Sequence, residues 1–310
     1  MKNYDSGSTE IKTYDTLAFL ARFMAPSPDL QAQLKPDPGH FFIVRLEAMY
    51  RQVNRRVPPS RSLAHSCLII TAGAATMTIG YDTYTARAGE LLFVPAGQVF
   101  SFGSDDENEG FLLHVHPNFL LGRYVPDAPV DAFEFLTPWG NRIISPSDDI
   151  VDAVLVIGKR LLTVYQEQGL TARPLLQSYL LALLGEVAQG YVPVSTTSQP
   201  AAYRLTHAFK VLLTERIRQQ HRVTDYASQL SISPNHLNKV VKETTGKSPT
   251  RWIDEALVLE AKVLLSQTAS PVATIADQLG FNDSSYFSRL FRRYEGISPL
   301  DFRRLIESSG

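Results

Sequence analysis

The sequence predicts an α+β protein of two domains, an N-terminal one of antiparallel β-strands with helices and a C-terminal one of helices alone. Three observations lead to this prediction. Short segments of alternating or β-rich residues fill the first half of the chain. A phrase of similar residues occurs twice near the end, and a polar stretch bounded by prolines separates the two parts.

The composition narrows the class of protein. With 310 residues, 44% of them hydrophobic, the chain suits one large domain or two ordinary ones. The single cysteine, Cys67, excludes an intrachain disulfide and a Cys-rich metal site, and it fits a reducing cytoplasm. The start of the chain lacks the apolar region of a signal peptide, and no apolar run approaches the roughly 18 residues of a membrane span. We therefore expect a soluble, cytoplasmic protein with no membrane partner.

The formal net charge of −1 conceals an asymmetry between the two parts. Residues 201–310 contain 15 Lys and Arg against 11 Asp and Glu, a net charge of +4, whereas residues 1–200 carry −5. A basic C-terminal part beside an acidic N-terminal part indicates that only the former meets a polyanion.

In chain order, the N-terminal half contains six predicted strand segments, at residues 41–50, 62–70, 75–86, 90–97, 98–103 and 110–116. Turn residues punctuate them, which favours an antiparallel sandwich or barrel. Two helical patterns follow at about residues 148–168 and 173–190. Residues 193–200, PVSTTSQP, have no periodicity and are typical of a linker. The predicted domains are residues 1–192 and 203–310, joined by a linker at 193–202.

The repeated phrase defines the C-terminal half. LNKVVKETTGKSPTRW at 237–252 aligns with FSRLFRRYEGISPLDF at 287–302, so that Gly-x-Ser-Pro falls at the same place in both. Each copy opens with a short apolar helix and a turn, and a second helix follows. Ser233 and Pro234 predict the start of that helix in the first copy, and Asn282 is the predicted cap in the second. This pattern predicts two helix-turn-helix motifs, with a generic pair of helical bundles as the alternative.

The second helix of each copy has one apolar face and one polar face. The apolar faces contain Leu237, Val240 and Val241, and then Phe287, Leu290, Phe291 and Tyr294. The opposite faces carry only amide, hydroxyl and basic groups, on Asn235, Asn238, Lys239, Lys242, Ser285, Ser288, Arg289 and Arg292. A plain solvated face usually mixes Glu among its Lys and Arg. Groups of these kinds are the ones that donate to base edges and phosphates, so these residues are the predicted DNA contacts.

The stretch from Tyr203 to Arg304 resembles the DNA-binding domain of the AraC family of bacterial transcription regulators. IADQLGFNDSSYFSRLFRRYEGISPLDFR corresponds to the signature segment of the family, and SPNHLNKVVKETTGKSPTRWI to its first copy. The resemblance implies seven helices, with one long helix at about 249–266 that separates two reading helices. It places the base-reading positions at Asn235, Asn238, Lys239, Ser285, Ser288 and Arg289. Asn235 and Lys239 differ from the aromatic and arginine residues often found there, so the operator sequence does not follow.

The same resemblance implies an N-terminal sensor, often a cupin-like β-barrel, and one segment supports this independently. GELLFVPAGQVF, with Gly89, Pro95, Gly97 and Phe100, resembles the second cupin motif. Metal-binding cupins have a histidine where Phe100 stands, and an aromatic ring cannot ligate a metal. The first motif, with its His-x-His and Glu spacing, is absent upstream. We therefore expect no metal, no cofactor and no enzyme activity.

The small-molecule site is predicted from strand alternation alone. His114 and His116 lie two apart on one strand and point to the same face, so they could share a metal, hydrogen-bond a ligand, line the barrel or lie exposed. The predicted pocket residues are Phe93, Phe100, Phe102, His114 and His116. A slip of one residue in register would reverse each choice.

The helix at 173–190 carries a stripe of Leu176, Leu180, Leu183 and Val187. Two interpretations are open, packing against the barrel or dimerisation across the stripe. We predict dimerisation, because the stretch is more apolar than one shielded face requires.

Together these features predict a ligand-responsive transcription regulator that binds double-stranded promoter DNA and a small-molecule effector as a homodimer. Activation, with RNA polymerase as partner, is the expected output of the family. The effector would act by binding two arrangements of the protein with different affinity. The alternatives are a regulator that needs no ligand and a metal-dependent cupin enzyme fused to a DNA-binding domain.

Overall fold

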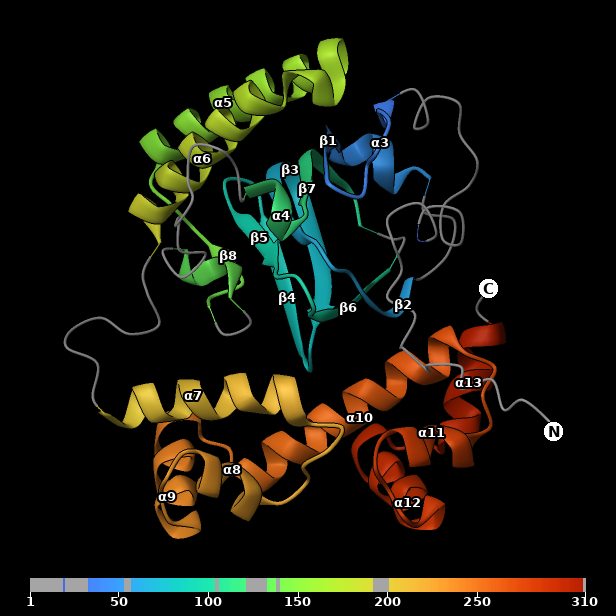
Figure 1. The fold of residues 1–310 in the computed structure, drawn as a ribbon. Coiled ribbons are helices and arrows are strands. Elements are labelled where there is room, and N and C mark those ends of the chain that lie inside the picture. The colour runs from blue at the N-terminus through green and yellow to red at the C-terminus, as the bar shows by residue number, and fades with distance from the viewer. Residues whose placement is uncertain are drawn as a thin grey trace, which may run out of the picture. The chain divides into compact units, whose positions relative to one another are not determined.

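The computed structural model of the chain describes residues 19, 33–52, 57–103, 106–120, 133–137, 140–191 and 201–308. It contains two compact units, one within residues 14–198 and one within residues 199–309 (Figure 1). The predicted linker at 193–200 lies outside the described residues. Ala201 and Ala202, assigned to the linker from the sequence, begin a helix instead, because alanine is the strongest helix former.

The N-terminal unit contains a sheet structure of eight strands: β1 (Phe41–Arg45), β2 (Val57–Arg61), β3 (His65–Ile79), β4 (Asp82–Arg87), β5 (Leu91–Val94), β6 (Val99–Phe102), β7 (Asn108–Val115) and β8 (Ile143–Ile144). Short helical segments accompany them: α3 (Leu46–Tyr50), α4 (Pro117–Leu120), η2 (Glu134–Leu136) and η3 (Gly169–Ala172). Two long helices complete the unit, α5 (Asp148–Gln168) and α6 (Arg173–Gly190).

The long strand β3 belongs to two layers of this antiparallel structure. Its first part pairs with β5 and β7 in the order β1-β7-β3-β5-β8, and its second part pairs with β4 and β6, with β2 beyond β6. The register shifts between Ile70 and Ala72, where the strand changes layer. Gly73 permits this change, because a Cβ there would lie 2.0 Å from the carbonyl oxygen of Glu107. The predicted antiparallel fold is confirmed, although no pairing among the described strands closes it into a complete barrel.

Three elements differ from the expected pattern. Residues 46–50 form α3 and not the end of a strand, because Leu46, Met49 and Tyr50 bury one helical face. The strand β2 was missed because it contains Pro58 and Pro59. Among the described strands β2 pairs with β6 alone, and proline is tolerated at such an edge. With two residues, β8 is too short to show a pattern.

Helices α5 and α6 lie beside each other against the sheet (Figure 1). Gly158 of α5 faces the ring of Phe111 in β7, and Leu180 and Leu183 of α6 meet Phe93 of β5 around a small internal gap. The stripe predicted to dimerise is at most 1% exposed throughout: Leu176, Leu180, Leu183 and Val187. The prediction of a dimer contact through these residues is therefore wrong, and packing within the domain accounts for them.

The C-terminal unit consists of seven helices within residues 201–308 (Figure 1). They are α7 (Ala201–Arg216), α8 (Val223–Gln229), α9 (Pro234–Thr245), α10 (Pro249–Gln267), α11 (Val272–Gln278), α12 (Ser284–Glu295) and α13 (Pro299–Ser308). The pairs α8–α9 and α11–α12 are the two helix-turn-helix motifs, and α10 connects them. Among the described residues, no helix is long and apolar enough to cross a membrane.

The glycine, serine and proline of the repeated Gly-x-Ser-Pro each have a conformational role. Gly246 and Gly296 end α9 and α12 with φ angles of 73° and 77°, the left-handed conformation that glycine adopts most readily. Ser248 and Ser298 then accept the backbone N–H of Arg251 and Asp301 at 3.3 and 3.2 Å. The prolines open α10 and α13 at positions where their missing N–H costs no hydrogen bond. The phrase is repeated because it stops one helix and starts the next.

Candidate nucleic-acid interface and ligand cavity

The helix predicted to read DNA in the first motif is α9, and its two faces are separated as predicted. Leu237, Val240 and Val241 are buried, with at most 5% exposure. On the opposite side Asn235, Lys239 and Lys242 are exposed and Asn238 is half-buried. The N-cap of the helix is Ser233, whose hydroxyl accepts the N–H of His236 at 3.2 Å. The four polar side chains thus lie on one ordered helical surface.

The helix predicted to read DNA in the second motif is α12, which repeats this arrangement; α9 and α12 are called the reading helices below. Phe287, Leu290 and Phe291 are buried, whereas Ser285, Arg289 and Arg292 are exposed and Ser288 is half-buried. Its N-cap is Asp283 and not the predicted Asn282, because the Asp283 carboxylate accepts the N–H of Ser285 at 2.8 Å. The turn before α12 is one residue longer than the turn before α9, which moves the cap one position along the chain.

Asn238 and Ser288 stand at equivalent positions, and both are bonded to their own helix. The Asn238 amide donates to the Pro234 carbonyl at 3.0 Å, and the Ser288 hydroxyl donates to the Ser284 carbonyl at 2.9 Å. The amide of Asn238 keeps one N–H and its carbonyl oxygen for a base edge. Arg289 is 69% exposed and lies 3.8 Å from the Asp283 carboxylate, so its guanidinium is held only loosely.

Two aromatic side chains at the start of the reading helices were not predicted from the sequence. Tyr286 is 52% exposed and follows Ser285, and the equivalent residue of the first motif is the exposed His236. Their alignment at equivalent positions was the available signal. Lys247 and Arg251 are basic residues that follow α9 in the chain. Both form ion pairs with Glu255, at 3.0 and 2.8 Å.

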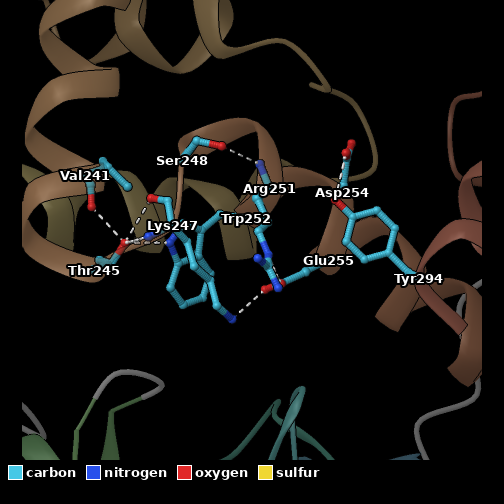
Figure 2. Close-up of polar contacts among 9 residues, drawn as sticks. All are labelled: Val241, Thr245, Lys247, Ser248, Arg251, Trp252, Asp254, Glu255 and Tyr294. Atoms are coloured by element: carbon cyan, nitrogen blue, oxygen red, sulfur yellow. Dashed lines mark hydrogen bonds and ion pairs between the residues drawn. The ribbon is translucent and has the colours of Figure 1, made fainter.

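One turn of α10 contacts both reading helices (Figure 2). The Trp252 indole N–H donates to the Thr245 hydroxyl at the end of α9, at 3.0 Å. The Tyr294 hydroxyl of α12 donates to the Asp254 carboxylate, also at 3.0 Å. Burial, and then the neighbouring Asp254, raise the pKa of Tyr294 to about 12, so its hydroxyl remains a donor at neutral pH. A further ion pair joins Lys262 of α10 to Glu295 of α12 at 2.9 Å.

We name this set of contacts the α10 brace, defined by Thr245, Trp252, Asp254, Tyr294 and the Lys262–Glu295 pair. Its members link the last turn of α9 and the last turn of α12 to a single helix. The family resemblance implied that one long helix, here α10, separates the reading helices. These side-chain contacts also restrain the orientation of each reading helix relative to α10.

A cavity of about 70 Å³ lies inside the N-terminal unit, between the two layers of strands. Its lining includes Phe100 and Phe102 of β6 and His114 of β7, three of the predicted pocket residues. The remaining lining residues are Phe19, Phe42, Leu46, Met49, Tyr50, Arg61, Ser62, Ser66, Leu68, Met77, Val94 and Leu112.

The structure places the other two predicted pocket residues elsewhere. Phe93 faces the opposite side of β5, where its ring lies 4.8 Å from that of Phe135. The register that was assumed for β5 is wrong by one residue, because Val94 and not Phe93 lines the cavity. His116 follows the end of β7, is half-buried, and accepts the Asn118 N–H at 3.2 Å.

His114 is a buried polar group of the cavity. Its ring stacks on Phe42 at 4.8 Å, and its Nδ1 lies 3.3 Å from the Ser66 hydroxyl. Burial lowers the pKa of His114 to about 3, so the imidazole is neutral at pH 7. Among the described residues, no three His, Cys, Asp or Glu side chains gather in the manner of a metal site.

Comparison with known proteins agrees with both halves of this description. Residues 41–184 match the AraC-like ligand binding domain family, and residues 226–305 match a helix-turn-helix domain family. The chain is 38% identical over 255 residues to the HTH-type transcriptional activator RhaS of Escherichia coli O1:K1 / APEC, covering 77% of this chain and 85% of that protein. It is 29% identical over 231 residues to the arabinose operon regulatory protein of Salmonella typhimurium strain LT2, covering 72% of this chain and 77% of that protein.

Among solved structures, ToxT from Vibrio cholerae aligns over 85% of this chain and 98% of its own, with 14% sequence identity and a TM-score of 0.44. The family assignment rests on the sequence matches, which cover both units and most of the length of a relative more than 30% identical. The chain belongs to the AraC family of transcription regulators, with a ligand-binding domain followed by a DNA-binding helix-turn-helix domain.

Proposed function

We propose that α9 and α12 read two successive major-groove segments of a promoter, and that a small molecule in the N-terminal cavity controls this binding. The observation that carries the first part is the pair of outward faces on α9 and α12. Each is supported by a buried apolar face, and the eight predicted contact residues include no carboxylate. Asn235, Asn238, Lys239, Ser285, Ser288 and Arg289 are the proposed base readers. Lys242 and Arg292, one turn further along, are the proposed phosphate contacts.

Tyr286 and His236 extend the proposed interface. Both are exposed beside the base-reading positions and can contact the backbone or a thymine methyl group at the flank of each reading helix. The proposed output is activation, which would make RNA polymerase a partner. It is supported by the relative that is named a transcriptional activator. Such a protein acts where the chromosome lies, in the cytoplasm.

The phosphate role of Arg292 is tested by the salt dependence of binding. Full-length protein is titrated onto a duplex taken from upstream of its own gene at several salt concentrations. Replacing Arg292 by alanine is expected to reduce the slope of log K against log salt by about 0.9, because one phosphate contact is lost. Arg87→Ala removes an exposed positive charge from the N-terminal unit and is the matched control. A slope that is equal in the wild type and Arg292→Ala would remove Arg292 from the interface.

Two further proposals concern the organisation of the protein. The two units act as separable modules joined by the linker at 193–200. The protein is also proposed to be a homodimer, through a surface other than the buried stripe of α6. Val156 of α5 and Leu175 of α6 support such a surface, since these apolar side chains are 67% and 40% exposed. Sedimentation equilibrium of the wild type and Val156→Asp tests this proposal.

We also infer that the chain is not a metal-dependent cupin enzyme. The support is chemical. Phe100, which lines the cavity, stands where the second cupin motif of metal-binding cupins has a histidine, and its ring cannot ligate a metal. Elemental analysis of purified protein that found about one metal ion per chain, lost in His114→Ala, would restore the enzyme alternative.

A further inference from the structure

The N-terminal unit has an acidic groove beside the cavity that is the proposed effector site. The groove lies where α3, the middle of β3 and the start of β7 come together. We propose that this groove binds an aliphatic diamine or polyamine. Such a site is distinct from the DNA interface and from the effector cavity, so its ligand can be tested without DNA and without the effector.

The groove has the size of a small-molecule site. Its volume is about 440 Å³, within the range of about 300–1,000 Å³ for pockets that hold small ligands. Ala72 and Gly73 form part of its wall, and their small side chains leave it open where β3 changes layer. Tyr50 lines both the groove and the cavity, so the two spaces are neighbours. An open space of this volume fits a linear molecule of several carbon atoms.

Carboxylates dominate the charge of the described part of the wall. Four acidic side chains line it against one basic side chain, Arg51, so four negative charges and one positive charge give a formal charge of −3. The four acidic residues are Glu47, Asp106, Glu107 and Glu109. A concave surface lined by one sign of charge raises the local concentration of ions of the opposite sign. The groove therefore attracts cations.

These carboxylates differ in how firmly the fold holds them. Glu47 pairs with Arg45 at 2.8 Å, which offsets part of its charge. The Asp106 carboxylate accepts the Thr76 N–H at 2.6 Å, which fixes it at the wall of the groove. The other two are exposed, Glu107 and Glu109. A ligand would therefore be held by one ordered carboxylate and by two exposed ones that can move toward it.

Asn108 indicates that the ligand carries hydrogen-bond donors as well as charge. It lines the groove and is 8% exposed, and its Oδ1 has no hydrogen-bond partner among the described residues. Its Nδ2 donates to the Ala74 carbonyl at 3.3 Å, so the unpaired atom is the oxygen, an acceptor. A buried acceptor without a donor is unfavourable, and it marks a place where a bound group can donate.

The environment of Tyr50 agrees with this orientation of the Asn108 amide. Burial, and then the Asp106 carboxylate, raise the pKa of Tyr50, and a hydrogen bond from Asn108 opposes this rise. A bond that favours the ionised hydroxyl is one that is donated to it, so Asn108 uses its nitrogen here too. The Asn108 oxygen is left to accept from a ligand.

The spread of the acceptors favours an amine over a metal ion. Among the described residues, no three Asp, Glu, His or Cys side chains gather closely enough to hold one metal ion. Carboxylates that are spread along a groove match a ligand whose positive charges are also separated. Each ammonium group of a polyamine carries several N–H donors, which form strong hydrogen bonds with carboxylates. One ammonium group can donate to Asn108 and Asp106 while another meets Glu107 or Glu109.

The test is isothermal titration of the full-length protein with putrescine and with spermidine, in the absence of DNA. We expect saturable binding of at least one of these amines, with a single amine per chain. Butanediol, which has the chain length of putrescine and no charge, should not bind. Tetramethylammonium, which is charged and has no N–H, should not bind either. Magnesium and calcium chloride are titrated separately, and saturable binding of a metal ion without binding of an amine would overturn the amine class.

Two variants locate the bound amine. Asn108→Leu removes the oxygen acceptor and should weaken binding at least about tenfold, since a hydrogen bond to a charged group is lost. The double variant Glu107→Gln with Glu109→Gln changes exposed side chains only, and should weaken binding at least about threefold. Its matched control is Asp152→Asn with Glu167→Gln, which removes two exposed carboxylates of α5 and should bind the amine as the wild type does.

Two results would overturn the amine site. One is that neither amine binds in a saturable way. The other is equal binding by the wild type, Asn108→Leu and the glutamine double variant, because the amine would then bind elsewhere. If circular dichroism shows that Asn108→Leu does not fold, the glutamine double variant and its control decide. Promoter binding and its salt dependence are measured separately, so failure of the amine site leaves the DNA-reading proposal in place.

Discussion

At the scale of single residues, two glycines with the same backbone angle are predicted to differ in what they tolerate. Gly280, in the turn of the second helix-turn-helix motif, and Gly296, at the end of α12, both have φ of 77°. A Cβ on Gly296 would meet open space, whereas one on Gly280 would lie 2.8 Å from the Arg218 carbonyl oxygen and 3.1 Å from the His221 ring. Glycine is therefore required at position 296 only because of the backbone conformation. At position 280 it is required by the conformation and also by the close neighbouring atoms.

Replacing each glycine by alanine should separate the two effects. Gly296→Ala is expected to cost about 1 kcal/mol of unfolding free energy, the usual penalty for alanine in a left-handed conformation. Gly280→Ala is expected to cost about 1–3 kcal/mol more, because the contact with backbone cannot relax easily. Urea denaturation of the two variants gives both values. An equal loss of unfolding free energy in the two variants would show that the atoms around Gly280 can move to accommodate a methyl group.

His114 links the cavity to the pH dependence of stability. Its pKa is lowered from 6.5 to about 3 by burial, so the unfolded chain takes up a proton between these values that the folded chain does not. The contribution of neutral His114 to the free energy of unfolding is therefore complete above pH 6.5, and it is lost as the pH falls toward 3. Near pH 5 the loss is about 2 kcal/mol.

The comparison is made between the wild type and His114→Gln, by denaturation at pH 7.5 and pH 5. The variant should lose less stability over this interval than the wild type does. Some loss should remain, since burial also lowers the pKa of His65, to about 4. A pH dependence that is identical in the two proteins would contradict a buried, neutral His114.

At the scale of helices and strands, the α10 brace leads to a prediction about the relation of the two reading helices. Tyr294→Phe removes the donor to Asp254 and leaves that carboxylate, half-buried in the structure, without this bond. We expect a loss of about 1.5–3 kcal/mol of stability in the C-terminal unit, the range for a hydrogen bond to a charged group. Tyr286→Phe, which alters an exposed tyrosine of the same helix, is the control and should cost little.

The same variant should alter how spacing affects DNA binding. In the wild type, inserting two base pairs between the two half-sites should weaken binding sharply, because α10 fixes the distance between α9 and α12. In Tyr294→Phe the penalty for the insertion should be smaller. If the variant has wild-type stability and the same spacing penalty, the brace has no role in holding the helices.

The elements also show why some features were predictable from the sequence and others were not. The faces of α9 and α12 were predictable because each helix buries one side only. The polarity of each residue therefore indicates whether its side chain points to the core or to solvent. The direction of Phe93 was not, since all four residues of β5 are buried and both faces of the strand look alike. The stripe of α6 was ambiguous for a related reason. An apolar surface packs equally well against its own sheet or against a second subunit.

At the scale of the whole molecule, the sequence repeat, the α10 brace and the two polar faces support the proposal that α9 and α12 both read DNA. Contacts in successive major grooves lie about 34 Å apart along the duplex. A change in α9 should therefore affect one base pair, and a change in α12 should affect another about one helical turn away. This independence distinguishes two reading helices from one reading helix with a structural partner.

The most direct measurement is a binding-site selection from random DNA with full-length wild type, Asn238→Ala and Arg289→Ala, with circular dichroism to confirm folding. Each variant should lose preference at one position and about 1–3 kcal/mol of affinity for the wild-type site, and the two positions should lie about one helical turn apart. Arg87→Ala should select the wild-type site. If both reading-helix variants fold and select an unchanged site, the outward faces of α9 and α12 do not read DNA.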